Sequence, residues 1–422
     1  MAEWATTPSP LAGEGRGGGS ASAKGLGAAP PLTPPRKGEG NAPYFSPAEF
    51  DARLAATRRS MAARGLDICL VSTPESIFYL TGLDHWGYFT PHLLLVPAED
   101  KMILVTRAME QVTVASHVRN ARFQGHSDSE TAADLAGRIL KGWGIRLRRV
   151  GIETQSAGLS YAAGVTLREA LPGAEWMDIT GLVDELRMVK SPAEQHFMRE
   201  AARVSDAAAG AATGAIRAGG SEREVAAECQ RAMILAGGTY PGFGPFIRST
   251  ARLGEEHTTW GDAHFQDGDA VFLELSGCVA RYHAPLGRLV HVGRAPDDAR
   301  AMARTTEEAF EAVLAALRPG ALFREVYAAW QGVVDLAGLP HYRRHHCGYL
   351  VGIGVPPSWT GGNKVTGLRG DSDIEVRTSM TFHVLSWMMG TGRGDFFLSN
   401  TVLLTENGPE VLTRTPTGVT VR

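Results

Sequence analysis

The stretch GDAVFLELSGCVARYHAPLGRLVHVG, residues 268–293, indicates two consecutive β-strands. Side chains alternate between the two faces of a strand, so Phe272 and Glu274 should share one face. A carboxylate in so apolar a strand either lies on the polar face of an edge strand or is buried with partners, because burial of an unpaired charge is costly. The shared face with Phe272 favours a lined cavity, which makes Glu274 a candidate site residue.

Two pairs of helices flank these strands. Residues 186–216 predict a long Ala-rich helix that Ser191 caps. Further helices are expected at about 221–236, 297–317 and 323–337, and strands with Gly/Pro-rich loops follow them to the end of the chain. Two helix pairs, each followed by antiparallel strands, predict an α+β domain over residues 186–422 with a hint of internal duplication.

The residues before this domain divide into two parts. Residues 1–42 are rich in Gly, Pro, Ala and Ser, so we expect a disordered extension and assign it no function. Order should begin with a helix that Ser46 and Glu49 start as a capping box. Strand and helix patterns then alternate over residues 43–185, which predicts an α/β domain.

Composition excludes several classes of function. The chain has 422 residues, of which 44% are hydrophobic and 21% charged, and its formal net charge is -3 without a run of one sign. We therefore expect neither nucleic-acid nor membrane binding, since both usually require a basic stripe. The absence of a signal-peptide pattern predicts a cytoplasmic protein. The four scattered cysteines should be reduced and packed, although Cys347, beside a histidine pair, could also be a nucleophile.

Histidines are concentrated in the second predicted domain. Eight of the 13 lie between His257 and His383, several of them at the ends of predicted strands. Imidazole is the side chain whose pKa lies nearest to neutrality, so such a group suits proton transfer. His257 lies in a Gly/Pro-rich loop and could equally face a cavity or be a surface imidazole. Taken together, the histidines indicate a site for acid–base chemistry.

Several segments, in this order, are similar to one known family. They are YLTG at 79–82, KSPAEQ at 190–195, the loop before His257, the strand pair at 268–293, H-x-x-G at 345–348 and TENGPEVLT at 405–413. Over roughly residues 45–413 the chain resembles the pita-bread family, which includes methionine aminopeptidase, prolidase, aminopeptidase P and creatinase. The resemblance implies a creatinase-like N-terminal α/β domain and a C-terminal pita-bread catalytic domain.

Peptidases of this family hold two metal ions with two Asp, one His and two Glu. The resemblance places these ligands at Glu274, Pro285, His345, Leu385 and Asn400. At most two of the five positions keep a ligating side chain, and hard divalent ions need several oxygen donors. We therefore expect no metal site and no other cofactor.

The loss of ligands is similar to creatinase and ectoine hydrolase, relatives that hydrolyse C–N bonds without a metal. RYHAPLGR at 281–288 and GYLVGIGVPPSW at 348–359 look more like ectoine hydrolase. However, Gly287 stands where creatinase has a carboxylate, and LSNT at 398–401 lacks a carboxylate expected in ectoine hydrolase. The resemblance implies a metal-independent hydrolase of a C–N bond in a small polar compound, and it leaves the substrate open.

The resemblance also implies roles for individual residues. His257 would shuttle the proton between the attacking water and the leaving nitrogen, with Glu274 orienting it and His345 stabilising the intermediate. The substrate-binding candidates are Trp86, Tyr88, Arg248, Tyr282, His283, Arg288 and His383. Either arginine could hold a substrate carboxylate, and Trp86 and Tyr88 would reach into the site from the partner subunit of a homodimer.

Three other functions stay open. A metal-dependent Xaa-Pro aminopeptidase or dipeptidase would need ligands that the resemblance does not supply. A non-catalytic relative would keep the cavity and bind a small molecule without turnover. A protein that uses the fold only as a partner surface is the reading least compatible with the dense group of histidines and tyrosines.

Overall fold

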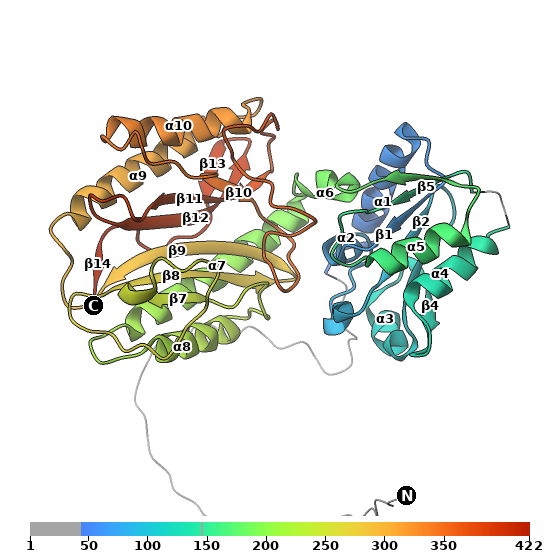
Figure 1. The fold of residues 1–422 in the computed structure, drawn as a ribbon, viewed down its shortest axis with the longest axis horizontal. Helices are drawn as coiled ribbons and strands as arrows, with labels where there is room; N and C mark the ends of the chain where they lie inside the picture. Colours follow the sequence, from blue (N-terminus) through green and yellow to red (C-terminus); the bar gives the residue numbers. More distant parts are fainter. Residues whose placement is uncertain (1–43, 145–146) are drawn as a thin grey trace, which may run out of the picture. The chain divides into compact units, whose positions relative to one another are not determined.

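The computed structural model describes residues 44–144 and 147–422, which contain two β-sheets (Figure 1). We refer to residues 44–187 as the first lobe and to residues 188–422 as the second lobe. The boundary predicted after residue 185 falls within the last helix of the first lobe. The extension predicted over residues 1–42 lies outside the described residues.

The first lobe is a six-stranded sheet with helices, in the order β4-β3-β2-β1-β5-β6. Its strands are β1 (Ile68–Val71), β2 (Leu93–Pro97), β3 (Met102–Arg107), β4 (Ala121–His126), β5 (Arg149–Ile152) and β6 (Glu175–Asp178). Its helices are α1 (Pro47–Ala63), α2 (Pro74–Thr81), α3 (Gln111–His117), α4 (Ala132–Lys141), α5 (Tyr161–Ala170) and α6 (Leu182–Arg187), with short 3₁₀ turns η1 (Trp86–Phe89) and η2 (Ala108–Glu110). The Ser46 hydroxyl accepts from the Glu49 amide at the start of α1. The predicted α/β organisation is confirmed.

The second lobe is built on a sheet in the order β10-β11-β12-β9-β8-β7. Its strands are β7 (Phe246–Ser249), β8 (Ala270–Val279), β9 (Tyr282–His291), β10 (Gly348–Leu350), β11 (Thr381–Met388), β12 (Phe396–Thr405), β13 (Gly408–Val411) and β14 (Thr420–Val421). Its helices are α7 (Pro192–Ala215), α8 (Glu222–Leu235), α9 (Ala299–Ala316) and α10 (Phe323–Leu336), with a short 3₁₀ turn η3 (Thr250–Arg252). All four were predicted from the sequence.

The second lobe has two similar halves (Figure 1). Helix α7 packs against α8 and against β8 and β9, while α9 packs against α10 and against β11 and β12. Each half also adds one short strand at an outer edge of the sheet, β7 in one and β10 in the other. The suggested internal duplication is therefore present as two helix pairs on one sheet.

The helices cover only one face of this sheet. In β8, Leu273 and Leu275 pack in the same core as residues of α7 and α8. Phe272 and Glu274 alternate with them and lie on the other face, as predicted. We call this second face, which the helices do not cover, the site face.

Helix α7 approaches β8 closely at Gly277. A Cβ atom added there would lie 2.4 Å from the Ala201 carbonyl oxygen and 2.7 Å from the Ser205 amide nitrogen. The Ser205 hydroxyl accepts from the Gly277 amide and donates to the Ala284 carbonyl, so it joins α7 to both β8 and β9. A glycine is required here for the close contact between the helix and the strand.

The two lobes share part of their hydrophobic core. Phe45 of the first lobe packs edge-on against Phe197 and Tyr282 of the second. The Tyr282 hydroxyl donates to Glu194, which lies 3.8 Å from Arg53 of the first lobe. This core couples the position of the first lobe to β9.

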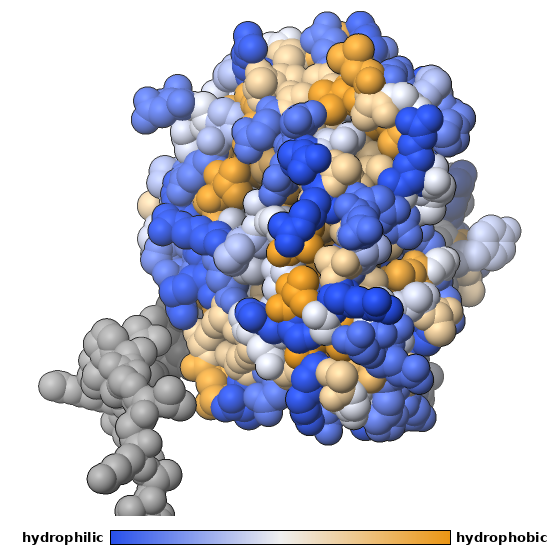
Figure 2. All heavy atoms as spheres, turned by 90° about the vertical axis from the view of Figure 1, so that its left-hand side faces the viewer, coloured by the Kyte–Doolittle hydropathy of each residue, from blue (hydrophilic) through white to orange (hydrophobic). Residues whose placement is uncertain are grey.

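The outer surface of the second lobe is largely hydrophilic on one face. On the face shown in Figure 2, hydrophilic side chains cover much of the surface and hydrophobic ones occur in small groups between them. Among the described residues, no helix combines the length and apolarity needed to cross a membrane.

We predict that Gly277→Ala lowers the free energy of unfolding by about 2 kcal/mol, because the added methyl group overpacks the contact between α7 and β8. Denaturant unfolding measures the change. Gly210→Ala is the matched control, since Gly210 is exposed on α7 with no neighbour within 4 Å of its added Cβ. The control should gain about 0.5 to 1 kcal/mol from the better helix former. Equal effects of the two substitutions would contradict the proposed close contact.

Candidate active site

Glu274 is the buried carboxylate of the site face. It is 8% exposed, and its nearest charged or titratable neighbour within ion-pair range is His383, whose Nδ1 lies 4.0 Å from Oε1. No described residue forms a hydrogen bond with this carboxylate. Burial raises its pKa to about 7, and the nearby Arg248 guanidinium opposes that increase. Glu274 can therefore exchange a proton near neutral pH.

Aromatic rings pack together on the same face of the sheet as this carboxylate. We call them the aromatic cluster, which consists of Phe243, Phe246, Phe272, Tyr349, Trp359, Trp387 and Phe397. Phe272 stacks on Phe397 with ring centroids 4.8 Å apart, and Phe243 meets Trp359 edge-on at 4.7 Å. The strand register explains the arrangement, because Phe246 lies opposite Glu274 and Trp387 lies opposite Phe397.

A chain of hydrogen bonds crosses the cluster next to Glu274. The Trp359 indole N–H donates to the Tyr349 hydroxyl over 2.9 Å, and the Tyr349 oxygen lies 2.8 Å from His383 Nδ1. No other described acceptor lies within hydrogen-bond distance of that hydroxyl, so Tyr349 donates to Nδ1. His383 then carries its proton on Nε2, which donates to the Ser399 hydroxyl over 2.8 Å. Burial lowers the pKa of His383 well below its ordinary value, so the ring is neutral.

Arg248 lies on the site face beside Glu274. Its guanidinium carbon lies 4.3 Å from the centroid of the Phe272 ring, and the side chain is 1% exposed. It donates to the Glu255 carbonyl, while its Nε has no hydrogen-bond partner among the described residues. This predicted residue therefore belongs to the site.

His257 and His345 lie at the exposed edge of the cluster. The His257 ring lies 6.1 Å from Phe246 and 6.4 Å from Phe243, measured between centroids. His257 also has a φ of 52°, an uncommon backbone conformation for a residue other than glycine. His345 is largely exposed, and its pKa is lowered by partial desolvation of the ring and by the Arg344 charge, with a further contribution from His257. The structure thus places His257 against the aromatic cluster, while His345 contacts His346, whose ring lies 5.5 Å from Tyr349.

Tyr282 and Arg288 lie on the opposite face of β9. Arg288 donates to the carbonyl groups of Ser399, Thr415 and Pro416 and to the side chain of Asn400, so its donors are committed. The Tyr282 hydroxyl donates a hydrogen bond to Glu194 in the core that the two lobes share. Side chains alternate between the two faces along β9. Gly287 lies on the site face, so Tyr282 and Arg288, which are separated from it by odd numbers of residues, lie on the other face and do not join the site.

His283 faces the site side of β9 but is fully engaged in structural contacts. Its Nε2 accepts from the Gly242 amide over 2.8 Å, and its Nδ1 lies 2.9 Å from the Arg281 carbonyl. Burial lowers the pKa of His283 to about 3, so it stays neutral. Its place is in supporting the loop that contains Gly242.

Trp86 and Tyr88 lie in η1 of the first lobe. Trp86 is 62% exposed and stacks on Tyr240 of its own chain, with ring centroids 4.1 Å apart. Tyr88 is half-buried and donates to the Leu83 carbonyl. The contact with Tyr240 places Trp86 beside the loop that leads to Phe243.

The side chains of the site face do not fit the two-metal centre of the family's peptidases. Glu274, Pro285 and Leu385 do share this face, but Asn400 points to the opposite one. Ser399, the neighbour of Asn400, faces the site and contacts His383 Nε2. The face therefore offers one carboxylate, and no group of three or more potential metal ligands exists within the described ranges.

Sequence reasoning missed the aromatic cluster and the Tyr349–His383–Ser399 chain. The signal was present in MTFHVLSW at 380–387, where a period of two puts His383, Leu385 and Trp387 on one face. Trp359 could not be found in this way, since it lies in an irregular loop.

All four cysteines are free and buried. Burial raises the pKa of Cys347, which keeps the thiol protonated and argues against a role as a nucleophile.

Comparisons with known proteins agree with this architecture. Residues 196–406 match the model of Metallopeptidase family M24, and residues 53–189 match that of the Creatinase/Prolidase N-terminal domain. The chain is 28% identical over 392 residues to the ectoine hydrolase of Halomonas elongata, covering 88% of this chain and 97% of that enzyme. It is 24% identical over 364 residues to the Xaa-Pro dipeptidase of Pyrococcus furiosus, covering 86% and 98%.

Solved structures show the same fold. The Xaa-Pro dipeptidase from Bacillus anthracis superposes with a TM-score of 0.77 at 22% identity, over 88% of this chain and 100% of that one. The predicted order of a creatinase-like domain and a pita-bread domain is confirmed.

We predict that Glu274→Gln becomes increasingly stable relative to wild type as the pH rises from 5 to 8. The folded-state pKa of Glu274 is about 7, above its ordinary 4.5. Its contribution to stability is therefore fully present below pH 4.5 and lost as the pH rises through 7, a change of about 3 kcal/mol at most. Urea unfolding at each pH measures the difference, with the exposed Glu308→Gln as the charge-matched control. A Glu274→Gln difference that is constant with pH would show that this carboxyl group is not perturbed.

Proposed function

Since the chain belongs to Metallopeptidase family M24 and is a hydrolase, we propose that it cleaves a C–N bond in a small polar compound without a metal ion. The observation that carries the proposal is Glu274, a single buried carboxylate where two-metal peptidases need five ligands. Hard divalent cations require several oxygen donors, and the neighbouring positions on the site face are Pro285, Leu385 and Ser399.

The aromatic cluster supports a cationic substrate. Ring faces attract delocalised cations, and that attraction is strongest where water is excluded. A carboxylate within a group of aromatic rings adds a charge that can pair with the same cation. An amidinium or a related C–N cation is therefore the substrate group that the site favours, with Arg248 beside it to hold a substrate carboxylate.

The proposed reaction uses His257 as the proton shuttle. Ionised Glu274 pairs with the amidinium and holds its carbon toward the mouth of the site. His257 takes a proton from water as the water oxygen adds to that carbon, and it then gives the proton to the leaving nitrogen as the C–N bond breaks. Neutral His383, fixed by Tyr349 and Ser399, keeps the wall of the site beside Glu274 in place.

The proposal also includes a homodimer formed through the first lobe. Trp86, Phe89, Met109 and Val112 are 62%, 76%, 68% and 80% exposed. His85 lies 3.3 Å from Glu110, so η1, which carries Trp86 and Phe89, lies next to η2, which carries Met109 and is followed directly by α3 with Val112. A group of large exposed apolar side chains is typical of a protein–protein contact, and a second copy of the chain is the partner that we propose.

We predict a metal-free protein that hydrolyses a cyclic amidine or a related C–N compound equally well with and without chelator. Mass spectrometry measures metal content, and a panel of ectoine, creatine, N-acyl amino acids and Xaa-Pro dipeptides measures specificity. Near-stoichiometric metal with chelator-sensitive dipeptide cleavage would instead identify a metal-dependent peptidase.

Two variants belong to the same assay. His257→Ala should lower kcat by at least about 100-fold, the usual scale for loss of a general acid–base group. His264→Ala is its matched control, because His264 is an exposed histidine whose described contact is a backbone bridge to Ser221. Near wild-type turnover in His257→Ala would remove His257 from the mechanism.

We predict a dimer in solution that Phe89→Asp together with Val112→Asp converts to a monomer, because the added charges would be buried in the contact. Multi-angle light scattering measures the mass. Tyr161→Asp is the control, since Tyr161 is 89% exposed on α5 of the same lobe. A wild-type monomer, or an unchanged dimer in the double variant, would contradict this interface.

A further inference from the structure

The segment 353–363 of the second lobe contacts both the first lobe and the candidate site. It follows β10 and carries Trp359, whose indole is 1% exposed and donates to Tyr349 inside the aromatic cluster. The position of this segment therefore determines whether one wall of the site is complete.

The inner side of the segment is tightly packed. A Cβ atom added to Gly242 would lie 2.2 Å from the carbonyl carbon of Ser358. Phe243, the next residue, meets the Trp359 ring edge-on. These contacts stop the segment from moving further into the site.

The outer side of the segment faces a cavity of about 580 Å³ that both lobes line. Ile353, Thr360 and Gly361 of the segment line this cavity, together with Asp184 and Arg187 of the first lobe. Because a cavity borders this side, fewer van der Waals contacts oppose an outward movement of the segment than oppose an inward one.

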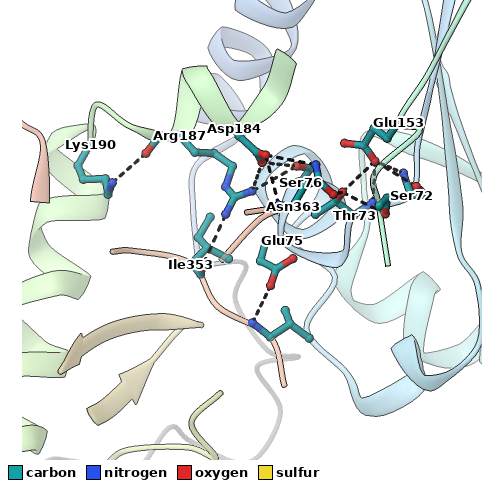
Figure 3. A network of polar contacts seen from close by, with 12 residues as sticks. Ser72, Thr73, Glu75, Ser76, Glu153, Asp184, Arg187, Lys190, Ile353 and Asn363 are labelled. Carbon is teal, nitrogen blue, oxygen red and sulfur yellow. Dashed lines mark hydrogen bonds and ion pairs between the residues drawn. The ribbon is translucent and has the colours of Figure 1, made fainter. Parts of the chain in front are cut away.

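Polar contacts from the first lobe restrain the segment on this side (Figure 3). The Val355 amide donates to Glu75 Oε1 over 3.1 Å, and the Asn363 side chain donates to Asp184 over 3.2 Å. Arg187 donates to Asp184 over 2.8 Å and reaches the Ile353 carbonyl at 3.4 Å. Both ends of the segment are therefore tied to the first lobe.

The groups that make these contacts are themselves fixed. Glu75 is 7% exposed and lies in the first turn of α2. The start of that helix is held by Glu153, whose Oε2 accepts from the Ser72 and Thr73 amides over 2.6 and 2.8 Å. Figure 3 shows Glu153, Thr73 and Asn363 in one continuous network that runs from the first lobe to the segment.

We propose that Glu75 is a positioning residue, which holds the segment 353–363 inward from the first lobe and so seats Trp359 in the substrate site of the same chain. The inference rests on the proposed function for its effect on catalysis, but its structural part is independent of any reaction. Glu75 touches no reacting atom. It acts through Val355 and Trp359, so its loss should weaken substrate binding rather than the chemical step.

The test compares Glu75→Ala with Glu75→Gln in the full-length chain. Hydrogen–deuterium exchange of a peptide covering residues 350–366 should be about ten-fold faster in Glu75→Ala, the change expected for loss of one buried hydrogen bond. KM for the cleaved compound should rise about ten-fold with kcat changed less than about three-fold, because Trp359 is a wall of the binding site. Glu75→Gln keeps an acceptor oxygen for the Val355 amide, so exchange and KM should return close to wild type.

Two further variants keep the result interpretable. Glu185→Ala is the control, since Glu185 is exposed, lines the same cavity and should change neither readout. Asn363→Ala removes a second tie and should reproduce the faster exchange even where Glu75→Ala fails to fold. Unchanged exchange in both Ala variants, or a fall in kcat at constant KM, would overturn the proposal. If the wild-type protein has no hydrolase activity, the proposed function is wrong. The proposed role of Glu75 in holding the segment would still be tested, because hydrogen–deuterium exchange needs no substrate.

Discussion

One constraint organises the second lobe, namely that helices cover only one face of its sheet. With that face buried, the period of two along each strand decides which residues reach the open face. Glu274, Gly287, Ser399 and Leu385 lie in register across four neighbouring strands. The site is thus a direct product of strand register, and a shift of one residue in any strand would replace its part of the site with core residues.

The same constraint explains which predictions from the sequence succeeded. Helix caps and apolar periodicity are local, so the helices and most strands could be predicted, and Glu274 was found because alternation within one strand is also local. Tyr282 and Arg288 were assigned to the site without knowledge of strand phase across the sheet, and both lie on the other face. Trp359 depends on the irregular segment 353–363 and on contacts made by the first lobe, which no single-strand pattern encodes.

The chemistry of the site face follows from what replaces the family's metal ligands. Leucine, proline, glycine and aromatic side chains lower the local polarity, and this is the physical reason that the Glu274 pKa moves toward neutrality. In the function that we propose, a single titratable carboxyl group and an environment that attracts a flat cation take the place of the Lewis acidity of a metal. The fold of the family is kept, while the side chains of the site face differ from the metal ligands of its peptidases.

The two halves of the second lobe are joined by a narrow seam. Strands β9 and β12 share two register pairs, whereas β8 and β9 share ten and β11 and β12 share eight. Arg288 crosses this seam with its bonds to Ser399 and Asn400. Glu274 belongs to one half and His383 to the other, so a ligand that touches both side chains would act as a clamp across the line where the two halves meet. Occupancy of the site would then determine how cooperatively the two halves unfold.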